Sequence, residues 1–570
     1  MGCSADKWEL MRSTVSVDRL SVIVKSADAA EARNAFAAHD LNVEIVEIDE
    51  TGHPSSGAAL RQAFERTSGA YVLLLGGDIA ANAEQLPEFF AQMKTKGADI
   101  VVGSKRHIRS LVKYPWHRRL LSAVYYLFVR WFIGVDVSDT RTGVRLFRRE
   151  TLAYALDRML VKNHAFDLEI LAIAAGHGAR IVEAPVVMRP DVNFTIMPGQ
   201  GVLRGIVNDT LAVFYRSRLL RYYEKCLVPN RLSHDPLVSV VIACPRGSWM
   251  LDECLDGLSR QTYRNWEAIV LPDEAVSTSS DRPNVRYFPT GKVRPAEKRN
   301  LGIREAKGEI VAFIDDDAYP DAHWLEFAVK YFGDLDVGAV GGPGVTPPGD
   351  RWLAHIGGRV YDNVLVSGNY RYRYKAGGVR RDVEDYPSCN LFVRKDLLDR
   401  IGGYRTDFWP GEDTLLCKDI IDSWKRIIYD PWIVVFHHRR ALFLPHLRQL
   451  GRYGFHRGYF CKRFPSNSLR PSYFVPTLFV VYLVALAVFA CAAWANPALA
   501  GRSGMGLALA AVPLVAYLVI VLLTTATWRL HYWFLTALGV FASHVTYGIR
   551  FMQGLCSRKA PCEYIGKDHV

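Results

Sequence analysis

Residues 301–320 read LGIREAKGEIVAFIDDDAYP, and this stretch decides the fold. Residues 310–314 are all apolar, which is the pattern of a strand buried inside a sheet. Three carboxylates follow at once, Asp315, Asp316 and Asp317. Carboxylates at the end of a buried strand are costly unless a cation meets them, and ligands bind α/β sheets at this end of the strand. The stretch therefore predicts a divalent cation, Mn²⁺ or Mg²⁺, that carries a nucleotide diphosphate, with a solvated acidic turn as the alternative.

Strand and helix patterns alternate on both sides of this stretch. Apolar runs at 237–245 and 266–274 each predict a buried strand, and the second ends near Asp273. A helix-like segment that contains Lys298-Arg299-Asn300 comes between them and the three carboxylates. This alternation predicts a doubly wound α/β domain.

The order of these motifs over residues 236–465 resembles the family-two glycosyltransferases of the GT-A fold. Gly411-Glu412-Asp413 looks like the family's Glu-Asp motif, and the resemblance makes Asp413 the general base with Glu412 as its neighbour. The stretch 449–453 resembles the family's Gln-x-x-Arg-Trp motif, with Tyr453 in place of Trp. The resemblance implies a nucleotide-sugar site formed by Pro245, Asp273, Lys298, Arg299, Asn300, Asp315, Asp316, Asn390, Gln449, Arg452 and Tyr453. In that family an Asp after the second strand, here Asp273, holds the nucleotide base, and residues 390–394 and 401–404 resemble the acceptor-side segment.

The chemistry of sugar transfer explains why such residues are needed. Departure of a nucleoside diphosphate leaves a doubly anionic group, which a metal held by Asp315 and Asp317 would stabilise. The attacking hydroxyl must lose its proton to a carboxylate within hydrogen-bond reach, and one direct displacement inverts the anomeric carbon. His437 and His438 follow an apolar run, so one of them is expected to complete the metal shell or to contact phosphate, with ordinary strand-end histidines as the alternative. Guanidinium groups that could clamp the diphosphate are Arg439, Arg440 and Arg452, with a solvated surface position as the alternative for the first two.

The first half of the chain repeats the pattern. Residues 69–78 align without a gap on residues 308–317. Residues 18–220 resemble the polyprenyl-phosphate sugar transferases of the dolichol-phosphate mannose synthase type, on motifs at 98–106, 139–147, 166–169 and 182–186. The metal pair of that family is reduced here to Asp78, because Gly76 stands where the other Asp belongs, and the preceding strand ends at Asp49 without the usual Asp-Asp-Gly-Ser. We therefore expect a first domain, 18–230, that has lost metal-dependent catalysis and serves as a scaffold, an acceptor or lipid platform, or a regulatory site.

The second domain is expected at 236–468, and a membrane region of two or three helices follows at 472–550. Residues 475–494 and 505–524 are uncharged and long enough to span, whereas 528–547 is a weaker segment that could span or lie in the interface. Positive charges before the first span and after the last place both domains in the cytoplasm. The net charge of +12 suits anionic partners, but no nucleic-acid motif accompanies it, and the ten cysteines show no zinc or disulfide spacing.

The sequence thus predicts two GT-A domains followed by transmembrane helices. The expected function is a membrane-bound, metal-dependent, inverting transfer of sugar from a nucleotide diphosphate sugar to a lipid-linked glycan or glycolipid, in cell-envelope polysaccharide synthesis. Three alternatives stay open. The chain could be a processive polysaccharide synthase, a bifunctional enzyme whose first domain also acts on a polyprenyl phosphate, or a non-catalytic membrane scaffold for other transferases.

Overall fold

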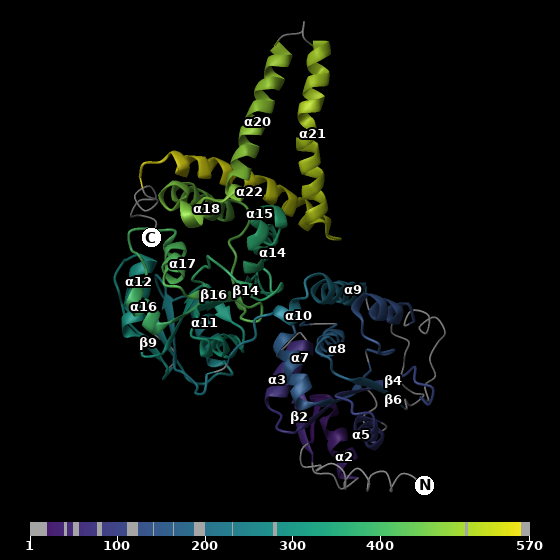
Figure 1. Ribbon diagram of the computed structural model, residues 1–570. Helices are drawn as coiled ribbons and strands as arrows, with labels where there is room; N and C mark the ends of the chain where they lie inside the picture. The colour runs from purple at the N-terminus through teal and green to yellow at the C-terminus, as the bar shows by residue number, and fades with distance from the viewer. Residues whose placement is uncertain are drawn as a thin grey trace. The chain divides into compact units, whose positions relative to one another are not determined.

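The computed structural model describes residues 20–38, 43–48, 56–76, 82–110, 123–140, 142–162, 165–186, 200–230, 232–276, 282–495 and 500–559 (Figure 1). The chain divides into two compact units, Met1–Val228 and Pro229–Val570. Each unit contains its own α/β sheet, and apolar helices follow the second sheet, so the predicted fold class is confirmed. The expected limits of the three domains stay a prediction.

The first unit has a six-stranded sheet in the order β2-β1-β3-β5-β4-β6. Only β5 is antiparallel to its neighbours, β3 and β4. The strands are β1 (Leu20–Lys25), β2 (Glu44–Ile48), β3 (Tyr71–Leu75), β4 (Ile100–Ser104), β5 (Val144–Arg148) and β6 (Ile181–Pro185). The helices are η2 (Ser26–Asp28), α2 (Ala29–Ala37), α3 (Ser56–Glu65), α5 (Leu86–Thr95), η3 (Val129–Ile133), α7 (Arg149–Arg158), α8 (Phe166–Gly176), α9 (Gln200–Phe214), η4 (Tyr215–Leu219) and α10 (Tyr222–Lys225).

The second unit has an eight-stranded sheet in the order β14-β16-β12-β15-β10-β7-β8-β9. Its strands are β7 (Val238–Ala243), β8 (Trp266–Leu271), β9 (Val285–Tyr287), β10 (Ile310–Asp315), β12 (Val337–Gly341), β14 (Arg381–Asp382), β15 (Asn390–Arg394) and β16 (Arg426–Tyr429). The helices around it are α11 (Trp249–Ser259), α12 (Pro295–Glu305), α13 (Trp324–Val329), η5 (Lys330–Gly333), α14 (Trp352–Tyr361), α15 (Val364–Ser367), η6 (Gly368–Arg373), α16 (Lys395–Ile401) and α17 (Glu412–Asp422).

Six central strands of the second sheet repeat the order of the first. β8-β7-β10-β15-β12-β16 corresponds to β2-β1-β3-β5-β4-β6, and β15 is antiparallel just as β5 is. The register agrees as well, because Ile314 pairs with Asn390 where Leu75 pairs with Val144. The internal repeat seen in the sequence is therefore a repeat of topology, and it places Gly76 in the first unit where Asp315 lies in the second.

The strand that carries the three carboxylates is buried for a simple reason. Val311, Ala312 and Phe313 have no exposed surface, because β10 lies between β15 and β7 with helices on both faces of the sheet. A separate three-stranded sheet, β11 (Ala318–Pro320), β17 (Val435–His437) and β13 (Gly344–Val345), begins directly after them. Its pairing of Ala318 with His437 brings the predicted histidines to the end of β10.

Five helices follow, α18 (Leu444–Arg463), α19 (Pro465–Ser468), α20 (Pro471–Ala495), α21 (Ala500–Thr525) and α22 (Leu530–Cys556). Within the described chain, the two helices long and apolar enough to cross a membrane are Pro471–Ala495 and Met505–Thr525. The weaker third segment lies in α22, which runs across the bases of α20 and α21 and beside α18 (Figure 1). Glycines permit this close packing, since a Cβ on Gly454 would lie 2.9 Å from the carbonyl oxygen of Tyr547.

A small apolar cluster joins α14 of the second α/β unit to these helices. Ile356 and Val360 of α14 pack with Leu442, Val521 of α21 and Val540 of α22. All five side chains are buried, with at most 4% of their surface exposed. Leu442, five residues after the end of β17, is therefore held between α14, α21 and α22.

A tight approach of two strand ends in the first unit gives a test of its fold. A Cβ on Gly143 would lie 2.5 Å from the carbonyl oxygen of Gly76, whereas a Cβ on Gly76 would meet only ordinary contacts, the nearest at 3.5 Å. We expect Gly143→Ala to lower the free energy of unfolding of the first unit by about 1–3 kcal/mol through overpacking, and Gly76→Ala to leave it nearly unchanged. Hydrogen exchange of the β3 and β5 amides in the full chain measures both. Equal protection in the two variants would contradict this packing.

Candidate active site

Arg299 joins the two acidic motifs of the second unit. It lies on α12, is 9% exposed, and donates from Nη2 to Asp315 Oδ1 at 3.0 Å and from Nη1 to Glu412 Oε1 at 3.2 Å. Asp413 Oδ1 is 3.9 Å from the same Nη1. Burial lowers the pKa of Arg299, but the surrounding carboxylates, Asp315 foremost, raise it by more than burial lowers it. The guanidinium therefore stays charged. The end of β10 and the start of α17 thus form one site.

The Glu-Asp pair divides into an inner and an outer carboxylate. Glu412 is 6% exposed, and the backbone N–H of Gly411 donates to its Oε2 at 3.0 Å. The Asp413 side chain is 30% exposed and accepts from Ser388 Oγ at 2.6 Å. Burial raises the pKa of both carboxyl groups, and Asp413 raises that of Glu412 further. Asp413 is therefore the member of the pair that an incoming hydroxyl can reach.

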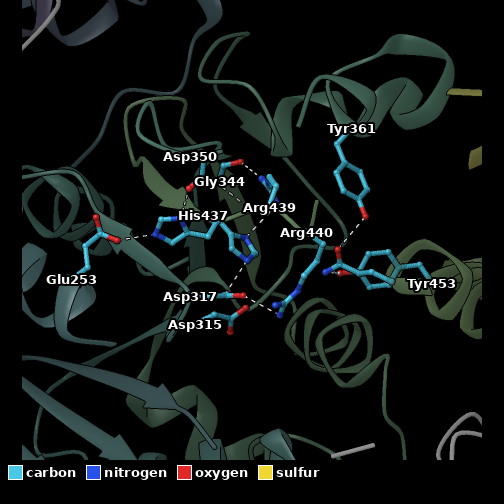
Figure 2. A network of polar contacts seen from close by, with 12 residues as sticks. Glu253, Asp315, Asp317, Gly344, Asp350, Tyr361, His437, Arg439, Arg440 and Tyr453 are labelled. Carbon is cyan, nitrogen blue, oxygen red and sulfur yellow. Dashed lines mark hydrogen bonds and ion pairs between the residues drawn. The ribbon is translucent and has the colours of Figure 1, made fainter. Parts of the chain in front are cut away.

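Three of the four predicted metal ligands lie together. One ligand atom from each of Asp315, Asp317 and His437 falls within 4.8 Å of the other two. Figure 2 shows Asp315, Asp317 and His437 facing one space from the end of β10 and from β17. Two carboxylates and one imidazole leave positions open for water and phosphate oxygens, which is a donor set that suits Mn²⁺ or Mg²⁺. Asp315, Asp317 and His437, called the metal-type cluster below, therefore fit the divalent cation that the sequence predicts.

Basic side chains already surround Asp317. His437 Nε2 is 3.1 Å from its Oδ1, and Arg440 donates from Nη2 to its Oδ2 at 3.2 Å. Burial would raise the pKa of Asp317, but His437, Arg440 and Arg439 together hold it below its usual range. Arg439 also donates to the carbonyl oxygen of Gly344 and reaches His437 Nδ1 at 3.3 Å (Figure 2). Two of the three arginines predicted to clamp diphosphate, Arg439 and Arg440, thus lie at the metal-type cluster.

The second predicted histidine has another position. His438 contacts Asp350 Oδ1 through Nδ1 at 2.5 Å and Glu253 Oε2 through Nε2 at 2.7 Å. Burial would lower its pKa, but these two hydrogen bonds raise it. Both ring nitrogens are occupied, so His438 joins α11 to the loop before α14 rather than facing the cluster of His437.

Asp273, the residue predicted to hold the base of the nucleotide, lies just after β8, and Pro245 lies just after the neighbouring strand β7. Lys298 is 4% exposed, forms an ion pair with Asp273 Oδ1 and donates to the carbonyl oxygen of Cys244 at 2.6 Å. The backbone N–H of Asp273 donates to the carbonyl oxygen of Pro245 at 3.1 Å. Burial, with the charges of Asp317 and Asp315, raises the pKa of nearby Asp316 to about 7. Lys298 and Asp273 therefore hold these two strand ends together beside the three carboxylates.

Two residues assigned to the nucleotide-sugar site have internal partners instead. The Asn300 side chain exchanges hydrogen bonds with the backbone of Tyr404, at 2.8 and 2.7 Å. Asn390 has no exposed surface, donates to the carbonyl oxygens of Gly342 and Ile433, and accepts from Trp324 Nε1 at 2.7 Å. Both amides fix backbone segments around the site.

The predicted 449–453 motif lies on α18. Gln449 Oε1 accepts from Tyr361 OH at 3.3 Å, and its Nε2 donates to Tyr453 OH at 3.3 Å. The Arg452 guanidinium carbon is 5.8 Å from the centre of the Trp409 ring. Tyr361 and Tyr453 lie on the Arg440 side of the cluster (Figure 2). Tyr453 of this motif, together with Tyr361 of α14, thus lies next to Arg440 (Figure 2).

Sequence reasoning missed Ser388 and Tyr404. Ser388 Oγ lies 2.7 Å from Tyr404 OH and donates to Asp413, so the chain Tyr404–Ser388–Asp413 orients the outer carboxylate. Tyr404 belongs to a Gly-Gly-Tyr turn that the sequence had marked only as part of the acceptor-side segment. No spacing rule singles out Ser388, because it lies in a loop far from Asp413 in sequence.

The first unit retains only part of this arrangement. Arg145 is buried and pairs with Asp167 at 2.7 Å, and Asp167 is the second residue of α8 as Asp413 is of α17. Gly76, which has no side chain, directly follows β3, and its carbonyl oxygen accepts from Asn82 Nδ2 at 3.0 Å. The predicted remnant residues Asp49 and Asp78 lie outside the described residues.

Neighbouring histidines with different partners give a matched test of the cluster. With a nucleoside diphosphate present, we expect His437→Ala to weaken Mn²⁺ binding by at least about tenfold. Loss of a residue that only hydrogen-bonds a metal ligand already lowers metal affinity by about tenfold or more, so loss of a ligand should cost at least as much. His438→Ala should leave Mn²⁺ affinity within a few-fold of the wild type, because its ring contacts Glu253 and Asp350. Titration followed by Mn²⁺ electron paramagnetic resonance compares the two. Similar losses in both variants, or in neither, would exclude His437 as a ligand.

Comparison with known proteins places the chain among its relatives. It is 32% identical over 157 residues to Undecaprenyl-phosphate mannosyltransferase of Micrococcus luteus, covering 27% of this chain and 63% of that relative. It is 26% identical over 217 residues to Glycosyltransferase AglE of Haloferax volcanii, covering 36% and 68%. The solved structure of Mannosyltransferase PcManGT from Pyrobaculum calidifontis, in complex with GDP-Man and Mn²⁺, is 21% identical with a TM-score of 0.37, covering 62% of this chain and 97% of that one.

The chain spans less than two thirds of the length of the first of these relatives. Two separate regions, residues 25–154 and 239–402, match the sequence profile of Glycosyl transferase family 2. Together they make up just over half of the 570 residues, and each falls within one of the two α/β units. The chain therefore belongs to glycosyl transferase family 2, with one matching region in each unit.

Proposed function

We propose that the second unit is a metal-dependent, inverting glycosyltransferase that uses a nucleotide diphosphate sugar. The observation that carries the proposal is the position of Arg299, whose guanidinium contacts Asp315 of the metal-type cluster and Glu412 of the Glu-Asp pair. One cation thus sets the separation between the place where diphosphate would bind and the carboxylate that would take a proton. A scaffold protein needs no such arrangement.

The residues of the chain have separate roles in this proposal. When bound at Asp315, Asp317 and His437, Mn²⁺ or Mg²⁺ supplies Lewis-acid stabilisation of the leaving diphosphate. Arg440 and Arg439 add positive charge on the same side, and Asp273 with Lys298 lies where the base of the nucleotide is expected. Asp413, oriented by Ser388, accepts the proton of the acceptor hydroxyl as that oxygen attacks the anomeric carbon. Attack from the side opposite the leaving group inverts the configuration.

We further propose a lipid-linked acceptor and an anchor in the cytoplasmic membrane, in cell-envelope polysaccharide synthesis. The support is the pair of apolar helices Pro471–Ala495 and Met505–Thr525, together with a relative named for an undecaprenyl-phosphate substrate. Two spans return the chain to its starting side. Lys462, Arg463 and Arg470 precede them, and Arg558 and Lys559 follow α22. Because positive charge is enriched on the cytoplasmic side of membrane spans, this supports the proposal that both α/β units face the cytoplasm.

Removing the proposed base is the direct test. Asp413→Asn keeps the shape and the Ser388 contact but cannot accept a proton, so turnover should fall by about 10²–10⁴-fold while nucleotide-sugar binding survives. Asp422→Asn makes the same change at the exposed end of the same helix, where the side chain is 57% exposed, and should retain wild-type turnover. Wild-type turnover in Asp413→Asn would refute the assignment.

The pH profile provides an independent readout of the same group. Burial raises the pKa of Asp413, and only its ionised form is a base, so kcat/KM should fall as the pH drops through that raised pKa. The Ser388 hydrogen bond favours the ionised form and lowers the pKa. Ser388→Ala should therefore shift the acidic limb of the profile toward higher pH. An unchanged limb would show that a different group titrates.

A second function deserves its own test, because the first unit also matches the family and repeats the topology of the second. If the first unit is catalytically inactive, as Gly76 in place of an Asp suggests, Asp78→Ala should leave every product within a few-fold of the wild type. Asp317→Ala should abolish sugar transfer. Products of both variants are compared with a polyprenyl phosphate among the acceptors. Loss of one distinct product in Asp78→Ala alone would make the chain bifunctional.

A further inference from the structure

The segment between β14 and β15 is hydrogen-bonded to the helix that carries the proposed base. Ser388 Oγ donates to Asp413 Oδ1 at 2.6 Å, and Thr414 Oγ1 donates to Asp385 Oδ1 at 3.2 Å. The two acceptors and donors alternate, so each side supplies one hydroxyl and one carboxylate. The first turn of α17 is therefore held at two neighbouring residues by a segment that lies far from it in sequence.

The same segment also contacts the next turn of α17. The backbone N–H of Tyr386 donates to Cys417 Sγ at 3.2 Å, and this thiol donates to the carbonyl oxygen of Tyr386 at 3.4 Å. Because Cys417 lies one helical turn after Asp413, both face the same side of the helix. Residues 385–388 therefore pack against α17 over more than one turn.

Asp385 is buried between two arginines. It is 9% exposed, and its Oδ2 accepts from Arg457 Nη2 at 2.5 Å and lies 3.5 Å from Arg373 Nη2. Burial would raise the pKa of Asp385, but Arg457 and Arg373 hold it well below its usual range. Turning this carboxylate away would leave buried charges uncompensated, which is strongly unfavourable. Asp385 is therefore a fixed, ionised point of attachment.

Arg457 connects this attachment point to α18. It lies one helical turn after Tyr453, so both side chains project from the same face of α18. Its guanidinium carbon is 5.4 Å from the centre of the Tyr473 ring at the start of α20. The preceding residue, His456, packs under the start of α17, where a Cβ on Gly411 would collide with its Nε2. Two adjacent residues of α18 thus support the turn that carries the Glu-Asp pair.

We propose that Asp385 is a positioning residue for the base of the proposed reaction. Its carboxylate joins Thr414 of α17 to Arg457 of α18. This joint fixes the segment that contains Ser388, so the Ser388 hydroxyl stays within hydrogen-bond reach of Asp413. The inference rests on the proposed function, which makes Asp413 the base. Such support is needed because displacement of a reacting group by about 1 Å can lower the rate by about 10²-fold.

The assay uses the full chain in detergent with Mn²⁺. The donor is the sugar that the wild type consumes fastest in a panel of UDP, GDP, CDP and dTDP sugars, with membrane lipids as the source of acceptor. Release of nucleoside diphosphate gives kcat and the KM for the donor, and thermal unfolding of the same samples gives Tm.

Thr414 provides the least disruptive variant. Thr414→Val keeps the shape of the side chain but cannot donate to Asp385, whose pairing with Arg457 remains. Loss of one positioning hydrogen bond should lower kcat by about tenfold, while KM for the donor and Tm stay close to the wild type. Thr414→Ser keeps a hydroxyl and should recover most of the lost turnover. Equal kcat in the two variants would overturn the proposal.

The pH profile separates positioning from a purely structural role. Asp385→Asn should loosen the Ser388 contact that lowers the pKa of Asp413, so the acidic limb of kcat/KM should move to higher pH. Loss of a nearby negative charge would by itself lower that pKa and move the limb the other way. A shift to lower pH would therefore contradict the proposal.

A double variant tests whether the two residues act through one hydrogen bond. The acidic limb of Asp385→Asn/Ser388→Ala should lie where Ser388→Ala alone places it, because both changes remove the same contact. Additive shifts would overturn the proposal. These variants retain the titratable and charged groups that face Asp413, which are Arg299, Asp315, Cys389, Tyr404, Glu412 and Cys417.

Asp430→Asn is the matched control for loss of a buried carboxylate. Asp430 is 2% exposed and accepts from Arg380 Nε at 3.0 Å and from Tyr331 OH at 2.5 Å. Its substitution also removes the charge from a buried ion pair, so Tm should fall as in Asp385→Asn while the acidic limb stays in place. A shifted limb in both variants would mean that stability controls the profile, and the positioning role would be wrong.

Asp413→Asn, measured in parallel, distinguishes the two proposals. If it is inactive while Thr414→Val and Asp385→Asn behave like the wild type, Asp413 remains the base and the role given to Asp385 is wrong. If Asp413→Asn itself has wild-type turnover, the proposed function is wrong, and the positioning role is refuted with it.

Discussion

The second unit depends on one buried cation, Arg299. Its guanidinium contacts Asp315 and Glu412 and lies near Asp413, so three carboxylates from two motifs share one buried charge. Removing one partner from such a buried group typically costs about 3–5 kcal/mol, because it leaves an uncompensated charge. The same constraint that holds the site together also sets the distance between the metal-type cluster and the proposed base. A substitution of Arg299 would therefore lower the stability of the second unit and change the geometry of the site at the same time.

The two units show how much of this fold survives without that constraint. The first sheet repeats the strand order and register of the second, yet Gly76 lies after β3 at the position that Asp315 has at the end of β10. Arg145 and Asp167 form a two-member pair in place of the network around Arg299. A buried apolar sheet is thus sufficient for the architecture, whereas the chemistry requires a few polar side chains at the strand ends.

The sequence predicted the features that depend on local pattern. The buried strand with its three carboxylates, the repeated α/β unit and the two apolar helices are each visible within about twenty residues. What it did not predict depends on the direction of a side chain. Asn300 and Asn390 carry the right chemistry for a ligand site but bind backbone groups, His438 faces away from His437, and Ser388 reaches Asp413 only through the fold. Periodicity also left α22 ambiguous, because its glycines Gly539, Gly548 and Gly554 pack on α14, α20 and α18 while its apolar composition resembles a weak span.

The cluster around Leu442 has a consequence for how the site responds to its surroundings. Arg440 contacts Asp317, and two residues later Leu442 is packed among α14, α21 and α22. A short segment therefore runs from the metal-type cluster to helices that a bilayer would surround. A change in the tilt of α21, such as a thinner or thicker hydrocarbon layer imposes, reaches a guanidinium of the site through that segment. If the proposed anchor and chemistry hold, lipid thickness would thereby be a variable of the reaction.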